Sequence, residues 1–142
     1  MQDRFKFRHW DKQIKQMRYG DIQLGCDGQP FVITNNKEKP VEDIKDVVTM
    51  QCTGLKDNTG KLIYEGEIVT DGRHNMLVYY DKETCSFALQ KRTQYTQKRF
   101  GKDGFERVSL RNLSEDSLKN HQLKIIGNIY ENPELLQANN AR

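Results

Sequence analysis

Residues 52–73, CTGLKDNTGKLIYEGEIVTDGR, alternate short strand-like runs with turn residues, and this alternation constrains the fold more than any other feature. Asn and Gly tolerate positive φ, so the run KDNTG at 56–60 predicts a turn, and DGR at 71–73 predicts another. Strands this short, joined by turns this tight, pair as antiparallel neighbours. Because no helix-period pattern is long enough to supply parallel crossovers, we expect a mainly β fold.

Similar patterns lie on both sides of this segment. Phe5, Phe7 and His9 alternate with basic residues, and together with residues 14–19 they predict an N-terminal hairpin. Residues 76–81 and 85–90 predict a second hairpin, with Cys85, Phe87 and Leu89 on its inner face. Further strands are expected at 30–33, 47–53, 61–64, 67–70 and 122–130.

Helix signals are confined to the end of the chain. Ser114 predicts a short helix that ends near Asn120, and Asn132 followed by Pro133 predicts another, with Asn132 as its cap. Leu135 and Leu136 are expected to cover the open end of a small core. We therefore predict a single domain over 1–142: an SH3-like partly open barrel around residues 63–89, with an N-terminal hairpin and short C-terminal helices.

Composition sets broad limits on compartment. The start of the chain has no apolar signal region, and no run approaches the roughly 20 apolar residues that span a bilayer. The three cysteines are widely spaced and odd in number, which favours thiols in a reducing compartment over a disulfide framework. We expect a soluble protein of the cytoplasm.

Three blocks of the sequence resemble the YopX family of small proteins encoded by bacteriophages and prophages. They are FKFRHWD at 5–11, TGLKDNTG at 53–60 continuing through IYEGEIV at 63–69, and IGNIYENPELL at 126–136. The resemblance implies a mainly β fold and a phage or prophage origin in a bacterial host. It brings no established activity and no catalytic residues. Residues 91–121 match no block of the family.

Catalytic and metal-binding constellations are not evident. His9, His74 and His121 lie far apart, and neither a Cys-x-x-Cys pair nor a glycine-rich phosphate loop is present. Asp57 and the acids Glu65 and Glu67 are close in sequence, but turn hydrogen bonding and solvation explain them better than general acid/base chemistry. We expect no enzyme activity, no metal and no cofactor.

Residues 91–121 form a polar, basic excursion, which is either functional or partly disordered. Between residues 88 and 111 seven basic residues face only two acids, although the whole chain carries a net charge of only +3. Tyr95, Phe100 and Phe105 interleave with the basic residues, as in proteins that bind single-stranded nucleic acid. The candidate phosphate contacts are Lys91, Arg92, Lys98, Arg99, Lys102, Arg107 and Arg111.

Two functions therefore compete: a non-catalytic binding module for a protein partner, and a nucleic-acid-binding protein that uses 91–111. The modest net charge favours the protein partner. Short edge strands around a small core also predict a homo-oligomer.

Overall fold

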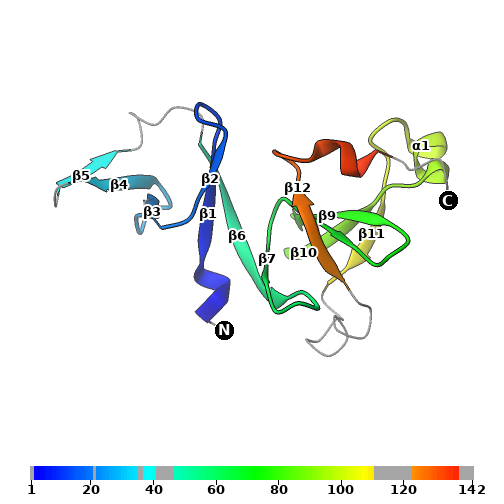
Figure 1. Cartoon of the computed structure of the whole chain (residues 1–142), viewed down its shortest axis with the longest axis horizontal. Helices are drawn as coiled ribbons and strands as arrows, with labels where there is room; N and C mark the ends of the chain where they lie inside the picture. The colour runs from blue at the N-terminus through cyan, green and yellow to red at the C-terminus, as the bar shows by residue number, and fades with distance from the viewer. Residues whose placement is uncertain (1, 21, 35–36, 41–46, 111–122, 138–142) are drawn as a thin grey trace. The chain divides into compact units, whose positions relative to one another are not determined.

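A computed structural model describes residues 2–20, 22–34, 37–40, 47–110 and 123–137. The contacts of the chain group into two compact units, residues 1–52 and 53–142, and each unit is described by itself. The expectation of a single domain stays a prediction. The described residues contain twelve strands, one α-helix and short 3-10 turns, which confirms the mainly β fold (Figure 1).

The first unit begins with the predicted hairpin. A 3-10 turn, η1 (Gln2–Phe5), leads into β1 (Phe7–Asp11), which pairs antiparallel with β2 (Gln16–Arg18) and places Trp10 opposite Met17. On its other side β1 pairs with the first half of β6 (Val47–Lys56), and His9 lies opposite Thr49. A separate sheet contains β3 (Ile22–Leu24), β4 (Pro30–Thr34) and β5 (Lys37–Pro40).

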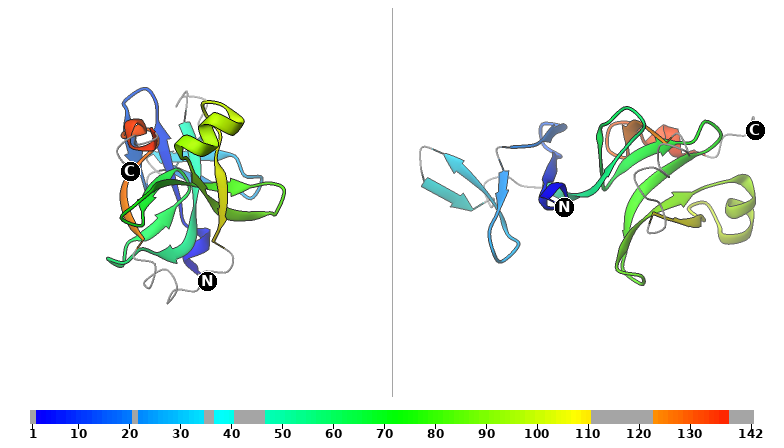
Figure 2. Two further views of the ribbon diagram at one scale, coloured as in Figure 1. Left: turned by 90° about the vertical axis from the view of Figure 1, so that its right-hand side faces the viewer. Right: turned by 90° about the horizontal axis from the view of Figure 1, so that it is seen from below.

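The second unit is built on a five-stranded antiparallel sheet in the order β11-β10-β9-β8-β12. Its strands are β8 (Glu67–Thr70), β9 (Asn75–Asp81), β10 (Ser86–Lys91), β11 (Glu106–Ser109) and β12 (Lys124–Asn128). The sheet curls into a half-barrel, as expected from the tight turns, and Figure 2 shows its twist from two further sides. β7 (Leu62–Tyr64) lies beside β6 in the neighbouring sheet.

Both faces of this sheet are apolar, because successive residues of a strand point to opposite sides. Val69, Met76 and Val78 join a core that includes Ile63, Leu89, Leu110 and Leu123. Their neighbours Ile68 and Leu77 face the other way and pack against Leu136. Leu136 belongs to the 3-10 turn η3 (Pro133–Leu136), and with Leu135 it covers this second face of the sheet.

Asp57 connects the turn predicted at 56–60 to β12. Its Oδ1 atom accepts hydrogen bonds from the Thr59 amide and hydroxyl and from the Lys61 amide, at 2.7–2.9 Å. Its Oδ2 atom accepts one from the Ile125 amide at 3.0 Å. Gly60 completes the turn with φ +90°, a conformation that strains any residue with a Cβ.

Several local expectations are corrected. Residues 94–100 and 106–109, expected as part of the basic excursion, form a helix and a strand. Residues 22–24 and 37–40, which were not among the expected strands, are also extended. Asn132 precedes η3 but makes no cap; its Oδ1 atom instead accepts from the Asn128 amide at 3.3 Å. The helix expected at 114–120 lies outside the described residues.

The three cysteines are free thiols, as expected, but one of them lies elsewhere than predicted. Cys85 does not face inward with Phe87 and Leu89: it is exposed in the turn between β9 and β10 at φ +50°. Cys26 is exposed in the first unit, and Cys52 is buried within β6. Among the described residues, which include all three cysteines, there is no disulfide.

Candidate binding surface on helix α1

Helix α1 (Gln94–Phe100) lies within the basic segment, between β10 and β11. It starts with a reciprocal cap: the Thr93 side chain accepts from the Thr96 amide at 3.2 Å, and the Thr96 hydroxyl oxygen accepts from the Thr93 amide at 2.8 Å. It ends at Gly101, whose φ of +96° favours glycine. Two caps thus stabilise a helix of two turns that has little apolar periodicity.

Part of α1 packs against the loop that follows it within the second unit. Thr96 is its only buried residue, and Gly104 passes so close beneath it that an added Cβ would lie 2.5 Å from the Thr96 carbonyl oxygen and 2.6 Å from the Phe100 Cβ. Phe105 then packs edge-on against Tyr79, with ring centroids 5.6 Å apart. Five of the seven residues of the helix are exposed: Gln94, Tyr95, Lys98, Arg99 and Phe100.

Two aromatic residues of α1 are exposed, and both lie close to the side chain of Arg99. Tyr95 is 64% exposed and Phe100 is 61% exposed. The Arg99 Nη1 atom donates to the Tyr95 hydroxyl at 2.8 Å, and its guanidinium lies 5.4 Å from the centroid of the Phe100 ring. Lys98 and Lys102 are exposed beside them. We call Tyr95, Lys98, Arg99, Phe100 and Lys102 the α1 surface.

Only part of the predicted basic set meets on this surface. Lys98, Arg99 and Lys102 do so. Lys91 lies in β10 opposite Glu106, and Arg92 has a largely buried side chain that donates to Gln90. Arg111 lies outside the described residues.

Arg107, another residue of the predicted set, makes two side-chain contacts with the sheet and its turn. Its Nε atom donates to Asp81 Oδ2 at 2.6 Å, and its Nη2 atom donates to the Thr84 hydroxyl at 2.9 Å. The hydrogen bond from Thr84 is the main cause that holds the pKa of Asp81 below its ordinary value, and the Glu83 amide and Arg107 add to it against the effect of burial. Burial and the nearby Asp81 charge raise the pKa of the Tyr79 phenol.

The residues considered for acid/base chemistry have structural contacts. Glu67, expected to be solvated, is buried, and its Oε1 atom accepts from the Tyr64 amide at 2.6 Å. His9 is buried, with Nδ1 3.0 Å from the Thr49 hydroxyl, and His121 lies outside the described residues. Within the described ranges no three His, Cys, Asp or Glu side chains cluster as metal ligands. In those same ranges, no helix has the length and apolar character needed to cross a membrane.

The family model described as "YopX protein" matches residues 6–137, which is nearly the whole chain. The chain belongs to the YopX family. A solved structure, the crystal structure of protein EF1440 from Enterococcus faecalis, is similar to this YopX chain with a TM-score of 0.60 and 24% sequence identity. The similarity covers 93% of this chain and 97% of that one, and it supports the fold. No curated protein matches the chain.

Sequence reasoning located the aromatic and basic residues of the α1 surface but missed the helix that arranges them. The available signals were Thr93 and Thr96 at cap spacing and Gly101 at the far end. Glu or Gln is the usual third residue of a helix with such a cap, so Thr96 at this position is a weak sequence signal.

Proposed function

We propose that this YopX protein is a non-catalytic binding module that captures an acidic segment of a partner protein on the α1 surface. The observation that carries the proposal is the arrangement of Tyr95, Arg99 and Phe100. Tyrosine, arginine and phenylalanine are enriched at protein interfaces, and tyrosine and arginine often carry most of the binding energy. Because Arg99 is already held by Tyr95 and Phe100, its binding would cost less side-chain entropy than that of a mobile arginine.

The charge of the α1 surface supports an acidic partner. Lys98, Arg99 and Lys102 are all exposed, and Asp103 is the adjoining acid. Opposite charge across an interface speeds association and excludes basic competitors. An extended segment with aspartate or glutamate beside an apolar residue complements both the cations and the rings.

Nucleic acid is the second candidate, because exposed aromatic rings beside cations can stack with bases. The number of available cations argues against it. With three phosphate contacts, the logarithm of the binding constant would fall with the logarithm of the salt concentration at a slope of roughly −2 to −3. Binding of that kind is weak at physiological salt. Arg107, one of the predicted contacts, is already paired with Asp81, which supports the lower count.

Peptide selection tests the protein-partner proposal. A random peptide library is selected against the full chain, and the recovered peptides are measured by fluorescence anisotropy. We expect acidic sequences whose affinity falls at least ~10-fold in a Tyr95→Ala/Phe100→Ala variant, a loss typical of interface anchors. The matched control is Phe5→Ala/Tyr19→Ala, which removes two exposed rings from the first unit and should leave the affinity unchanged. Peptides that bind all three proteins equally would refute the proposal.

An oligonucleotide titration decides between the two candidates. Labelled single- and double-stranded oligonucleotides are titrated with the chain at 50 and 200 mM salt, as appropriate for a phosphate interaction. Weak or undetectable binding is expected. Tight, salt-sensitive binding that disappears in Lys98→Ala/Arg99→Ala/Lys102→Ala would instead establish nucleic acid as the ligand of the α1 surface.

Self-association and a phage or prophage origin stay predictions. Light scattering over a range of protein concentrations tests the first, and a mass equal to one chain at the highest concentration would exclude a homo-oligomer.

A further inference from the structure

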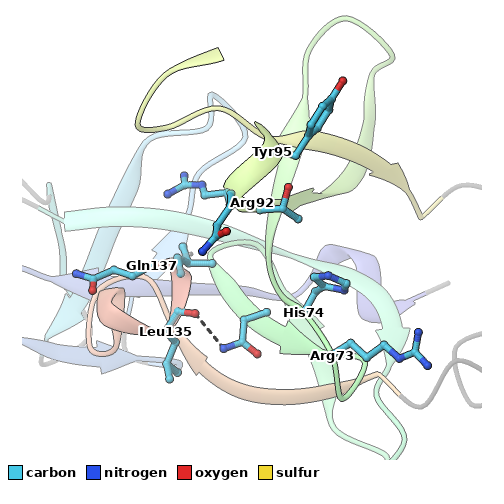
Figure 3. A pocket seen from close by; sticks show the side chains of 10 residues that line it. Arg73, His74, Arg92, Tyr95, Leu135 and Gln137 are labelled. Carbon is cyan, nitrogen blue, oxygen red and sulfur yellow. Dashed lines mark hydrogen bonds between the residues drawn. The ribbon is translucent and has the colours of Figure 1, made fainter. Parts of the chain in front are cut away.

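A cavity of about 210 Å³ lies within the second unit, apart from the outward cations of the α1 surface (Figure 3). Three segments line it: residues 73–75 at the β8–β9 turn and the start of β9, residues 92–95 at the junction of β10 and α1, and residues 135–137 at the end of η3. The Asn75 side chain donates to the Leu135 carbonyl at 2.9 Å and so ties two of these segments together. The cavity therefore has walls fixed by the fold.

Two arginines and one histidine line the cavity. They are Arg73, Arg92 and His74, and no described lining residue is acidic. Figure 3 shows Arg92 on one side and His74 and Arg73 on the other, with the Arg73 side chain extending outward. Arg92 is therefore the main cation of the cavity itself.

Arg92 has few protein partners for a side chain that is only 19% exposed. Its Nη2 atom donates to Gln90 Oε1 at 2.9 Å, and its Nη1 atom lies 3.9 Å from Asp103, whose own side chain is 83% exposed. Its Nε atom is buried, and no described residue accepts a hydrogen bond from it. Burying a charge is costly unless the charge is well paired. The long contact with the solvated Asp103 carboxylate offsets little of the desolvation cost of the Arg92 guanidinium.

We propose that this cavity binds a compact oxyanion, a carboxylate or phosphate group, against the guanidinium of Arg92. The guanidinium presents N–H donors in a fixed plane that suits both groups, and the partly sheltered position strengthens the interaction over one in open water. His74 on the facing side would add a donor. Tyr95 lines the cavity and also belongs to the α1 surface, whereas Lys98, Arg99, Phe100 and Lys102 do not line the cavity, so an anion can be tested here apart from those cations.

Backbone amide NMR on the full chain tests this site. Sodium phosphate and sodium acetate are titrated separately, with sodium chloride holding the ionic strength constant. We expect saturable shifts at the amides of Asn75, Thr93 and Gln94. Saturation with phosphate, with acetate or with both supports the site and identifies the group that it takes. A peptide with a free terminal carboxylate, compared with its amidated form, then shows whether a protein can supply that group.

Two variants and a control connect the shifts to Arg92. Arg92→Gln should weaken binding at least ~10-fold, the effect of losing a charge-assisted hydrogen bond. Arg92→Lys keeps the charge without the planar donors and should weaken binding less, which provides a second reading if Arg92→Gln does not fold. Lys98→Gln removes a cation outside the cavity and should change nothing. Linear shifts with both anions, or equal affinities in wild type and both Arg92 variants, would overturn the proposal.

Discussion

The Oδ2 atom of Asp57 accepts a hydrogen bond from the backbone amide of Ile125 at 3.0 Å, across 68 positions of sequence. The same carboxylate accepts three hydrogen bonds within its own turn through Oδ1. One buried side chain, 1% exposed, thereby joins the β6–β7 turn to strand β12. The ionised carboxylate accepts hydrogen bonds at both of its oxygen atoms. Asparagine has the same shape but only one acceptor oxygen, so it cannot satisfy both sets of donors.

Replacing Asp57 by Asn should therefore destabilise the protein. The amide keeps one acceptor oxygen but turns its NH₂ group toward N–H donors on the other side. Leaving buried donors unsatisfied costs about 1–3 kcal/mol in the free energy of unfolding. Urea denaturation measures the loss, and Asp103→Asn, at an 83% exposed side chain, is the control. Equal unfolding midpoints for the two variants would contradict this account of Asp57.

The stabilisation by Asp57 should also depend on pH. Burial raises the pKa of this carboxyl, but the hydrogen bonds from Ile125, Thr59 and Lys61 outweigh burial and bring it below the ordinary value of 3.8. A carboxyl with a lowered pKa in the folded state stabilises the fold fully above its unfolded pKa, and the stabilisation is lost as pH falls through the folded value. The difference in unfolding free energy between wild type and Asp57→Asn should be constant above about pH 5 and should shrink below about pH 4. A constant difference down to pH 2 would contradict the prediction.

The capping residue Thr93 should control the stability of α1. Thr93→Ala removes the acceptor for the Thr96 amide, and the loss of such a cap costs about 1 kcal/mol. Hydrogen exchange at the Gln97 and Gly101 amides, which donate to backbone carbonyls in and before α1, should accelerate roughly 5-fold if α1 opens locally. Thr93→Ser keeps the hydroxyl and should exchange at the wild-type rate. Unchanged exchange in Thr93→Ala would show that packing alone holds the helix.

Gly104 should tolerate no side chain. A Cβ there would lie 2.5 Å from the Thr96 carbonyl oxygen and 3.0 Å from that of Gly101, so Gly104→Ala must displace α1 or its own loop. Overpacking of this kind costs about 1–3 kcal/mol in the free energy of unfolding. Gly20→Ala, where nothing lies within 4 Å, is the matched control and should be neutral. Thermal unfolding monitored by circular dichroism compares the two.

Local chemistry made most of the strands predictable. The turns around Gly60 and Gly72 and the alternation in β1 and β10 contain their signals within a few residues. Cys85 was placed wrongly because alternation was extended one residue beyond the strand into a turn with positive φ. A pattern of period two does not show where the strand ends.

The candidate surface was predictable as composition but not as geometry. Helix α1 has one buried residue, Thr96, so hydrophobic periodicity could not indicate it. Its position depends on the close approach of Gly104 and on the packing of Phe105 against Tyr79, a residue distant in sequence. The hydrogen bond between Arg107 and Asp81 is likewise a tertiary contact. The sequence alone therefore did not show that Arg107 differs in its contacts from the other basic residues of the segment.

The positions of the cysteines allow the distance between the two units to be measured by energy transfer in the unaltered sequence. Cys26 and Cys85 are exposed in different units, whereas Cys52 is buried. Maleimide dyes should react with the two exposed thiols and leave the third unmodified, since a buried thiol is inert. Energy transfer between a donor and an acceptor dye would then report the separation of the two units in solution, and its change on adding a ligand, without any engineered substitution.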